Sequence, residues 1–173
     1  RCATATSMLP YGVFVVSTHP VLVEIYRGQA VESQHRGSIA VVDADGKIVL
    51  ELGDIETPIF PRSAVKSFQA LPLVESGIAD RFGLTDEELA LTISSHSGEP
   101  RHTETALGIL QKAGRDQTCL ECGAHWPSDN VAERALAAAS QKPSALHNNC
   151  SGKHSGFICL ACGLDEDPKG YIK

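Results

Sequence analysis

The strongest constraint on the fold is an abrupt change of sequence pattern at Pro61. Before it, residues 21–28, 38–43 and 47–53 form short runs rich in β-branched side chains, and the DADG at 43–46 supplies a tight turn between the last two runs. After it, apolar side chains recur at helical spacing. Strands followed by helices predict an α+β (α/β mixed) fold, with an antiparallel sheet and packed helices.

The part of the sequence after Pro61 predicts five helices. The first begins near this proline and is stopped by Gly77. Thr85, followed three residues later by Glu88, has the pattern of a capping box at the start of the second. The predicted helices cover residues 61–77, 85–94, 102–114, 130–141 and 151–163.

Length and charge restrict the classes of function. A chain of 173 residues with 42% hydrophobic content can bury the core of a single domain, and we expect residues 1–18 to form an irregular segment. The net charge of -6 argues against binding to nucleic acid or to an anionic membrane, because both require a positive surface. No apolar run approaches the roughly 20 residues of a membrane span and no signal peptide is evident, so we expect a cytoplasmic protein.

The segment PIFPRSAVKSFQA, residues 58–70, places Ser63 and Lys66 three residues apart. On a helix this spacing puts both side chains on one face, within reach of each other. Apolar surroundings favour the neutral form of an amine, and a neutral amine can remove the proton of a serine, which then attacks a carbonyl carbon. The structural alternative is an ordinary solvated lysine.

The segment LTISSHSGEP, residues 91–100, ends an apolar helix in a turn rich in hydroxyl groups that includes Ser95. Such a turn can present side chains to a cleft. Its structural alternative is a capping turn.

The segment LHNNCSGKHSGF, residues 146–157, is too polar for a core helix. Cys150 and Lys153 are three residues apart, as are Ser151 and His154, so this turn can bring a thiolate, an amine and an imidazole together. Zinc binds cysteine and histidine readily, whereas lysine is an unusual ligand that must lose its proton. Because a chain of this size with a real core does not need disulfides, we expect its six cysteines to be reduced thiols or part of a metal site.

Taken together, FPRSAVKSFQALPLVESG, SSHSGEPRHTETAL, CGAHWP and LHNNCSGKHSGF resemble, in this order, the rhizobial-type L-asparaginase family, also called asparaginase II. The resemblance runs from about His19 to Tyr171. It implies a fold similar to that of serine β-lactamases and glutaminases. The implied reaction is hydrolysis of the side-chain amide of L-asparagine to L-aspartate and ammonia.

The resemblance also implies roles for individual residues. Ser63 would be the nucleophile of an acyl-enzyme mechanism, Lys66 its base, and Ser95 a second active-site serine. Arg62 and His154 would contact the carboxylates of the substrate.

Cys150 and Lys153 would, by the same resemblance, bind a zinc ion close to the active site. Family members run to roughly twice this length, and a further lysine and a zinc-binding cysteine lie in the part that follows. We therefore expect this chain to be the N-terminal half of a longer protein, or to be completed by a C-terminal segment or a second chain. The family also suggests a homodimer.

Two other functions stay open from the residues alone. The pairs CLECG at 119–123 and CLACG at 159–163 are typical of zinc knuckles, and would make the protein a zinc-stabilised binding module without activity. Alternatively, a Ser-Lys hydrolase could act on glutamine, a peptide or a β-lactam. Glutamine differs from asparagine by one methylene group, which changes binding by only about 1 to 3 kcal/mol.

Overall fold

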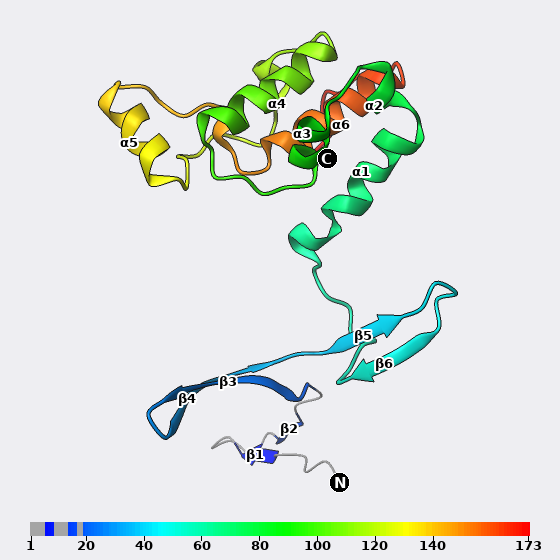
Figure 1. Ribbon diagram of the computed structural model, residues 1–173, viewed down its shortest axis with the longest axis vertical. Coiled ribbons are helices and arrows are strands. Elements are labelled where there is room, and N and C mark those ends of the chain that lie inside the picture. Colours follow the sequence, from blue (N-terminus) through cyan, green and yellow to red (C-terminus); the bar gives the residue numbers. More distant parts are fainter. Residues whose placement is uncertain (1–5, 9–13, 17–18) are drawn as a thin grey trace. The chain divides into compact units, whose positions relative to one another are not determined.

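The computed structural model describes residues 6–8, 14–16 and 19–173 (Figure 1). Its chain divides into two compact units, the first ending at Phe60 and the second beginning at Pro61. The first contains short antiparallel sheets and the second contains helices, so the predicted α+β class is confirmed. The single-domain organisation of a longer protein stays a prediction.

Three antiparallel strand pairs make up the described part of the first unit. They are β1 (Thr6–Met8) with β2 (Phe14–Val16), β3 (Val21–Arg27) with β4 (Ala30–Arg36), and β5 (Ile39–Val42) with β6 (Ile48–Leu52). The three predicted runs correspond to β3, β5 and β6. Strands β1 and β2 stand within the segment expected to be irregular, of which residues 1–5, 9–13 and 17–18 lie outside the described residues.

The second unit begins with a short 3-10 helix, η1 (Arg62–Val65), that leads directly into α1. The α-helices are α1 (Lys66–Glu75), α2 (Ile78–Arg81), α3 (Asp86–Thr92), α4 (Pro100–Lys112), α5 (Asn130–Ala138) and α6 (Ser151–Gly163), with the 3-10 turns η2 (Gln117–Cys119) and η3 (Ala145–His147) between them. All five predicted helices are present, and the predicted capping box of Thr85 and Glu88 is formed. Within the described ranges, no helix has the length and apolar character needed to cross a bilayer.

Helix α6 organises the second unit, because it contacts α1, α2, α3 and α4 (Figure 1). Its glycines allow these contacts: a Cβ atom on Gly152 would lie 2.6 Å from the carbonyl oxygen of Leu91, and one on Gly163 would lie 2.5 Å from the Ile78 side chain. Ile158 and Cys159 of α6 are fully buried in two neighbouring apolar clusters. The start of α6 is thereby held next to the end of α3, where the polar segments of the sequence meet.

Candidate active site

Three segments bring the predicted catalytic residues together. Ser63 lies in η1, Lys66 is the first residue of α1, and Ser95 lies between α3 and α4. We call residues 93–99, which join those two helices, the serine loop. All three residues belong to the second unit.

The hydrogen bonds run from Lys66 to Ser95 and from Ser95 to Ser63. The Lys66 Nζ donates to Ser95 Oγ over 2.6 Å and to the carbonyl oxygen of Ser94 over 2.6 Å. The hydroxyl oxygens of Ser63 and Ser95 are 3.2 Å apart. The sequence spacing suggested a direct contact between Lys66 and Ser63, but in the structure the amine reaches Ser63 through the hydroxyl of Ser95. The reason is that Ser63 stands in the 3-10 turn, while the lysine extends from the next helix to the serine loop.

Lys66 is almost fully buried, with 3% of its surface exposed. Within residues 19–173 the ion pairs involve other side chains, so the oxygens facing this amine belong to neutral groups. A buried charge without a counterion is costly. This lysine is therefore not an ordinary solvated surface residue.

Arg62, immediately before the candidate nucleophile, has a left-handed backbone with φ of 48°. This conformation costs about 1 to 2 kcal/mol for a residue with a Cβ atom. Strained residues cluster at functional sites, where the surrounding structure maintains them. The side chain of Arg62 is exposed, which leaves it accessible to a ligand.

His96 anchors the serine loop from the inside. It is 6% exposed, its Nε2 is 2.8 Å from Ser151 Oγ, and its Nδ1 accepts a hydrogen bond from the backbone N–H of Gly98 at 3.1 Å. Burial, and then repulsion by neighbouring histidines and by Lys66, lowers the pKa of His96 to about 4. The sequence placed this histidine in a hydroxyl-rich turn but gave no sign of its role.

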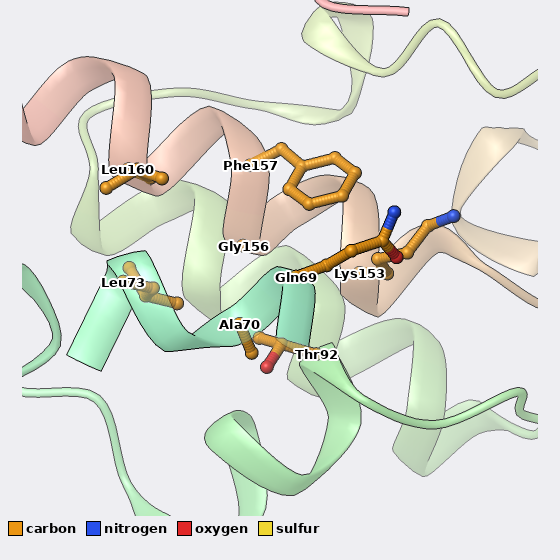
Figure 2. A pocket seen from close by; sticks show the side chains of 8 residues that line it. All are labelled: Gln69, Ala70, Leu73, Thr92, Lys153, Gly156, Phe157 and Leu160. Carbon is orange, nitrogen blue, oxygen red and sulfur yellow. The ribbon is translucent and has the colours of Figure 1, made fainter. Parts of the chain in front are cut away.

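The predicted metal ligands occupy the first turn of α6. Cys150 is the residue that caps this helix and Lys153 lies within it, and both are partly buried. The Lys153 Nζ lies 5.7 Å from the centre of the Phe157 ring. Lys153 and Phe157, but not Cys150, line a small pocket between α1, α3 and α6, in which the polar ends of Gln69 and Lys153 point to the same side (Figure 2).

A structural zinc site takes four donors, of which Cys150 and Lys153 would supply two. Among the residues that the structure describes, no group of three histidine, cysteine or acidic side chains is arranged to hold a metal. Cys122 lies near this turn, because the side-chain amide of Asn148 donates to its carbonyl oxygen at 2.8 Å, and burial raises the pKa of its thiol. A thiol and an amine fit zinc, but further ligands would have to come from elsewhere.

His154, the predicted contact for a substrate carboxylate, packs against an aromatic group. Its Nδ1 is 3.0 Å from the hydroxyl oxygen of Tyr171. The same hydroxyl accepts a hydrogen bond from the backbone N–H of Glu121 at 2.9 Å. Burial, followed by the charges of Lys153 and Lys66, lowers the pKa of His154 to about 4. The ring is thus neutral near pH 7 and offers a single N–H, not a cation. Sequence reasoning did not identify the support from Tyr171.

The cysteines of the two CxxCG segments do not form a four-cysteine site. Cys159 is fully buried beside Leu73 and Ile78, and burial raises the pKa of its thiol to about 11. Cys119, Cys122 and Cys162 pack against the other apolar cluster. All four act as small hydrophobic residues in the packing of the second unit.

Comparison with known proteins supports one family. A search of curated proteins finds no match. The sequence model described as L-asparaginase II matches residues 23–173, a range that includes every residue of the site described above. Its match covers most of the chain, and the chain therefore belongs to the L-asparaginase II family.

Proposed function

We propose that this protein hydrolyses the side-chain amide of L-asparagine to L-aspartate and ammonia through an ester formed on Ser63. The observation that carries the proposal is the chain of contacts from Ser63 through Ser95 to the buried amine of Lys66. Membership of the L-asparaginase II family supports an amide substrate.

In the first half-reaction the neutral amine of Lys66 acts as the base. It accepts the proton of Ser95 while Ser95 accepts the proton of Ser63, along the contacts of 2.6 Å and 3.2 Å. The freed oxygen of Ser63 bonds to the amide carbon of the substrate. The proton then returns from Lys66 to the departing nitrogen, the C–N bond breaks, and ammonia leaves.

In the second half-reaction water replaces ammonia. Lys66, again through Ser95, takes a proton from the water, whose oxygen bonds to the carbonyl carbon of the aspartyl ester. The proton passes back to the Ser63 oxygen as the ester bond breaks. L-Aspartate is released and the three side chains regain their starting protonation.

Arg62 and His154 would recognise the charged ends of the substrate. A guanidinium binds a carboxylate through two parallel hydrogen bonds, and the exposed Arg62 adjoins the nucleophile. His154 would donate one hydrogen bond from its neutral ring.

Cys150 and Lys153 would hold a zinc ion beside this site, together with ligands outside the described residues. When bound, zinc would fix the start of α6 and shape the substrate pocket. No chemical step in the proposed mechanism depends on it. The homodimer, the completing C-terminal segment and the cytoplasmic location stay predictions.

A β-lactam substrate is the main alternative for a Ser-Lys site. An S-D-N tripeptide, a motif of β-lactamases, does occur at residues 128–130. Here, however, Asp129 is the N-cap of α5, and its carboxylate accepts a hydrogen bond from the backbone N–H of Ala132. The start of a helix therefore accounts for this tripeptide.

Substrate comparison with the full-length protein tests the proposal. We expect ammonia release from asparagine with a higher kcat/KM than from glutamine, and no hydrolysis of a chromogenic β-lactam. Faster turnover of glutamine would change the assigned substrate, and β-lactam hydrolysis without ammonia release would replace the proposed function.

A further inference from the structure

His96 connects two parts of the site that are far apart in sequence. Its ring reaches Ser151 at the start of α6, with 2.8 Å between Nε2 and Oγ, and its backbone N–H donates to the carbonyl oxygen of Asn149 at 3.0 Å. The next residue towards the N-terminus is Ser95, whose hydroxyl contacts Lys66 and Ser63. The serine loop is therefore fixed through His96 to the residues on both sides of Cys150.

The hydrogen bonds determine where the proton of the His96 ring lies. Because the N–H of Gly98 donates to Nδ1, this nitrogen carries no proton, and Nε2–H must donate to Ser151. The Ser151 hydroxyl in turn donates to the carbonyl oxygen of Leu146 at 2.8 Å. His96 and Ser151 are 6% and 0% exposed, so this buried network satisfies each of the polar groups that it contains.

The two neighbouring side chains of the loop have opposite environments. Ser95 is exposed, and its hydroxyl bonds to Ser63 and Lys66, whereas His96 is buried and bonds to α6. The position of an exposed loop serine depends on what holds its backbone, and here the buried histidine provides that support.

We propose that His96 is a positioning residue that holds Ser95 between Ser63 and Lys66 by fixing the serine loop to the start of α6. This inference rests on the proposed Ser63 mechanism. A displacement of about 1 Å in a catalytic group can reduce the rate about 100-fold. The loss of His96 would therefore reduce the chemical step, even though its ring touches neither the substrate nor Ser63.

The kinetic test uses three variants of the full-length protein. His96→Gln keeps a donor to Ser151 but loses the acceptor for the N–H of Gly98. His96→Asn keeps the acceptor for Gly98 but loses the donor to Ser151. Ser151→Ala removes the hydroxyl on α6 that accepts the hydrogen bond from His96. We expect kcat for asparagine to fall about 10- to 100-fold in His96→Asn and Ser151→Ala, with KM changed less than about threefold. The loss in His96→Gln should be smaller. Unchanged kcat in folded His96→Asn and Ser151→Ala would overturn the proposal.

A double-mutant cycle separates positioning from general stabilisation. If His96 acts through Ser95, then His96→Asn added to Ser95→Ala should lower kcat little further. If His96 instead acts independently of Ser95, the reductions in kcat caused by the two substitutions multiply in the double variant. That result would contradict the proposal. Thermal melting of each variant confirms that it is folded at the assay temperature.

The histidine tautomer gives a readout that does not depend on activity. Nitrogen-15 NMR of wild-type protein with labelled histidine should show a neutral His96 ring at pH 7, protonated at Nε2, and Ser151→Ala should shift that resonance. A ring protonated at Nδ1, or on both nitrogens, would contradict the inferred hydrogen bonds of His96 with Gly98 and Ser151 and would overturn the proposal. Absence of asparagine turnover in wild type, together with the expected tautomer, would reject the proposed function and leave these hydrogen bonds in place without a catalytic role.

Discussion

At the scale of the residue, Arg62 combines backbone strain with a position next to the candidate nucleophile. The backbone of Arg62 has a φ of 48°, a conformation that glycine adopts without steric cost. The side chain that bears this strain is exposed and is not needed for packing. A role in substrate binding would explain why arginine stands there.

We predict that Arg62→Gly raises KM for asparagine at least about 10-fold, because two hydrogen bonds to a carboxylate are lost. The free energy of unfolding in urea should fall by less than about 1 kcal/mol, since relief of strain offsets the greater chain entropy of glycine. Arg62→Lys, which keeps the charge but not the paired donors, is the matched control and should have an intermediate KM. An unchanged KM in Arg62→Gly would remove this residue from the binding site.

His96 also gives stability a defined dependence on pH. Its pKa is lowered from 6.5 to about 4 by burial, and by the groups that face it, which are His102, Lys66, His125 and His147. Between these two values the unfolded chain binds a proton that the folded protein does not bind. Stability due to His96 is therefore complete above pH 6.5 and is lost as the pH falls towards 4.

Urea unfolding at pH 7 and pH 5 measures this effect. We expect the wild-type midpoint to fall on acidification by more than that of His96→Gln, which lacks the titrating group. An identical change in the two proteins would mean that His96 is not buried as a neutral ring.

At the scale of the element, the serine loop depends on the helices at its two ends, α3 and α4. The carboxylate of Glu88 in α3 accepts a hydrogen bond from Lys112 in α4 at 2.5 Å and from the backbone N–H of Thr85 at 2.7 Å. Burial opposes ionisation of Glu88, but these hydrogen bonds outweigh it and lower the pKa of the carboxyl group. The side chain of Glu88 thus caps one helix and ties it to the next.

We predict that Glu88→Ala lowers the free energy of unfolding by about 2 to 3 kcal/mol, because it removes a cap and leaves the partly buried amine of Lys112 without its carboxylate, with the carbonyl oxygen of Gly83 as its remaining partner. Its neighbour Glu87 provides the control, since its ion pair with Arg101 is exposed. Glu87→Ala should change stability by less than about 0.5 kcal/mol. Equal losses in urea unfolding of the two variants would contradict this account of Glu88.

The sequence predicted elements better than it predicted contacts. Thr85 with Glu88 marked the start of α3 correctly, because a capping box is local. Strand β4 was missed, since AVESQHR combines polar residues with little strand preference, and α2 was missed because four residues show no period. The bond from Lys66 to Ser95 spans 29 residues and depends on how α1 and α3 pack on α6, which no local pattern encodes.

Considered as a whole, the second unit uses α6 to bring the candidate catalytic residues and the predicted zinc ligands close together, because α6 contacts both α1 and α3. His154, the residue after Lys153 in α6, is held by the contact of 3.0 Å between its Nδ1 and the hydroxyl of Tyr171. The thiol and amine at the start of α6 would thus act on the shape of the substrate pocket and not on the proton path through Ser95.

We therefore predict that removing zinc from the full-length protein with a chelator raises KM for asparagine several-fold. Turnover at saturating asparagine should be retained, and Cys150→Ser should reproduce the effect. Readdition of zinc should restore KM in wild type but not in the variant. Complete loss of kcat on chelation would show that the metal takes part in the chemical step.

The nucleophilic role of Ser63 is tested most directly by the rate of ammonia release from asparagine, measured for the full-length wild type and for Ser63→Ala. Ser67→Ala, which changes an exposed serine of α1, is the control and should retain the wild-type rate. We predict turnover by the wild type and a loss of at least about 1,000-fold in folded Ser63→Ala, as expected when a covalent nucleophile is removed. Equal rates in the wild type and Ser63→Ala would contradict the proposed mechanism.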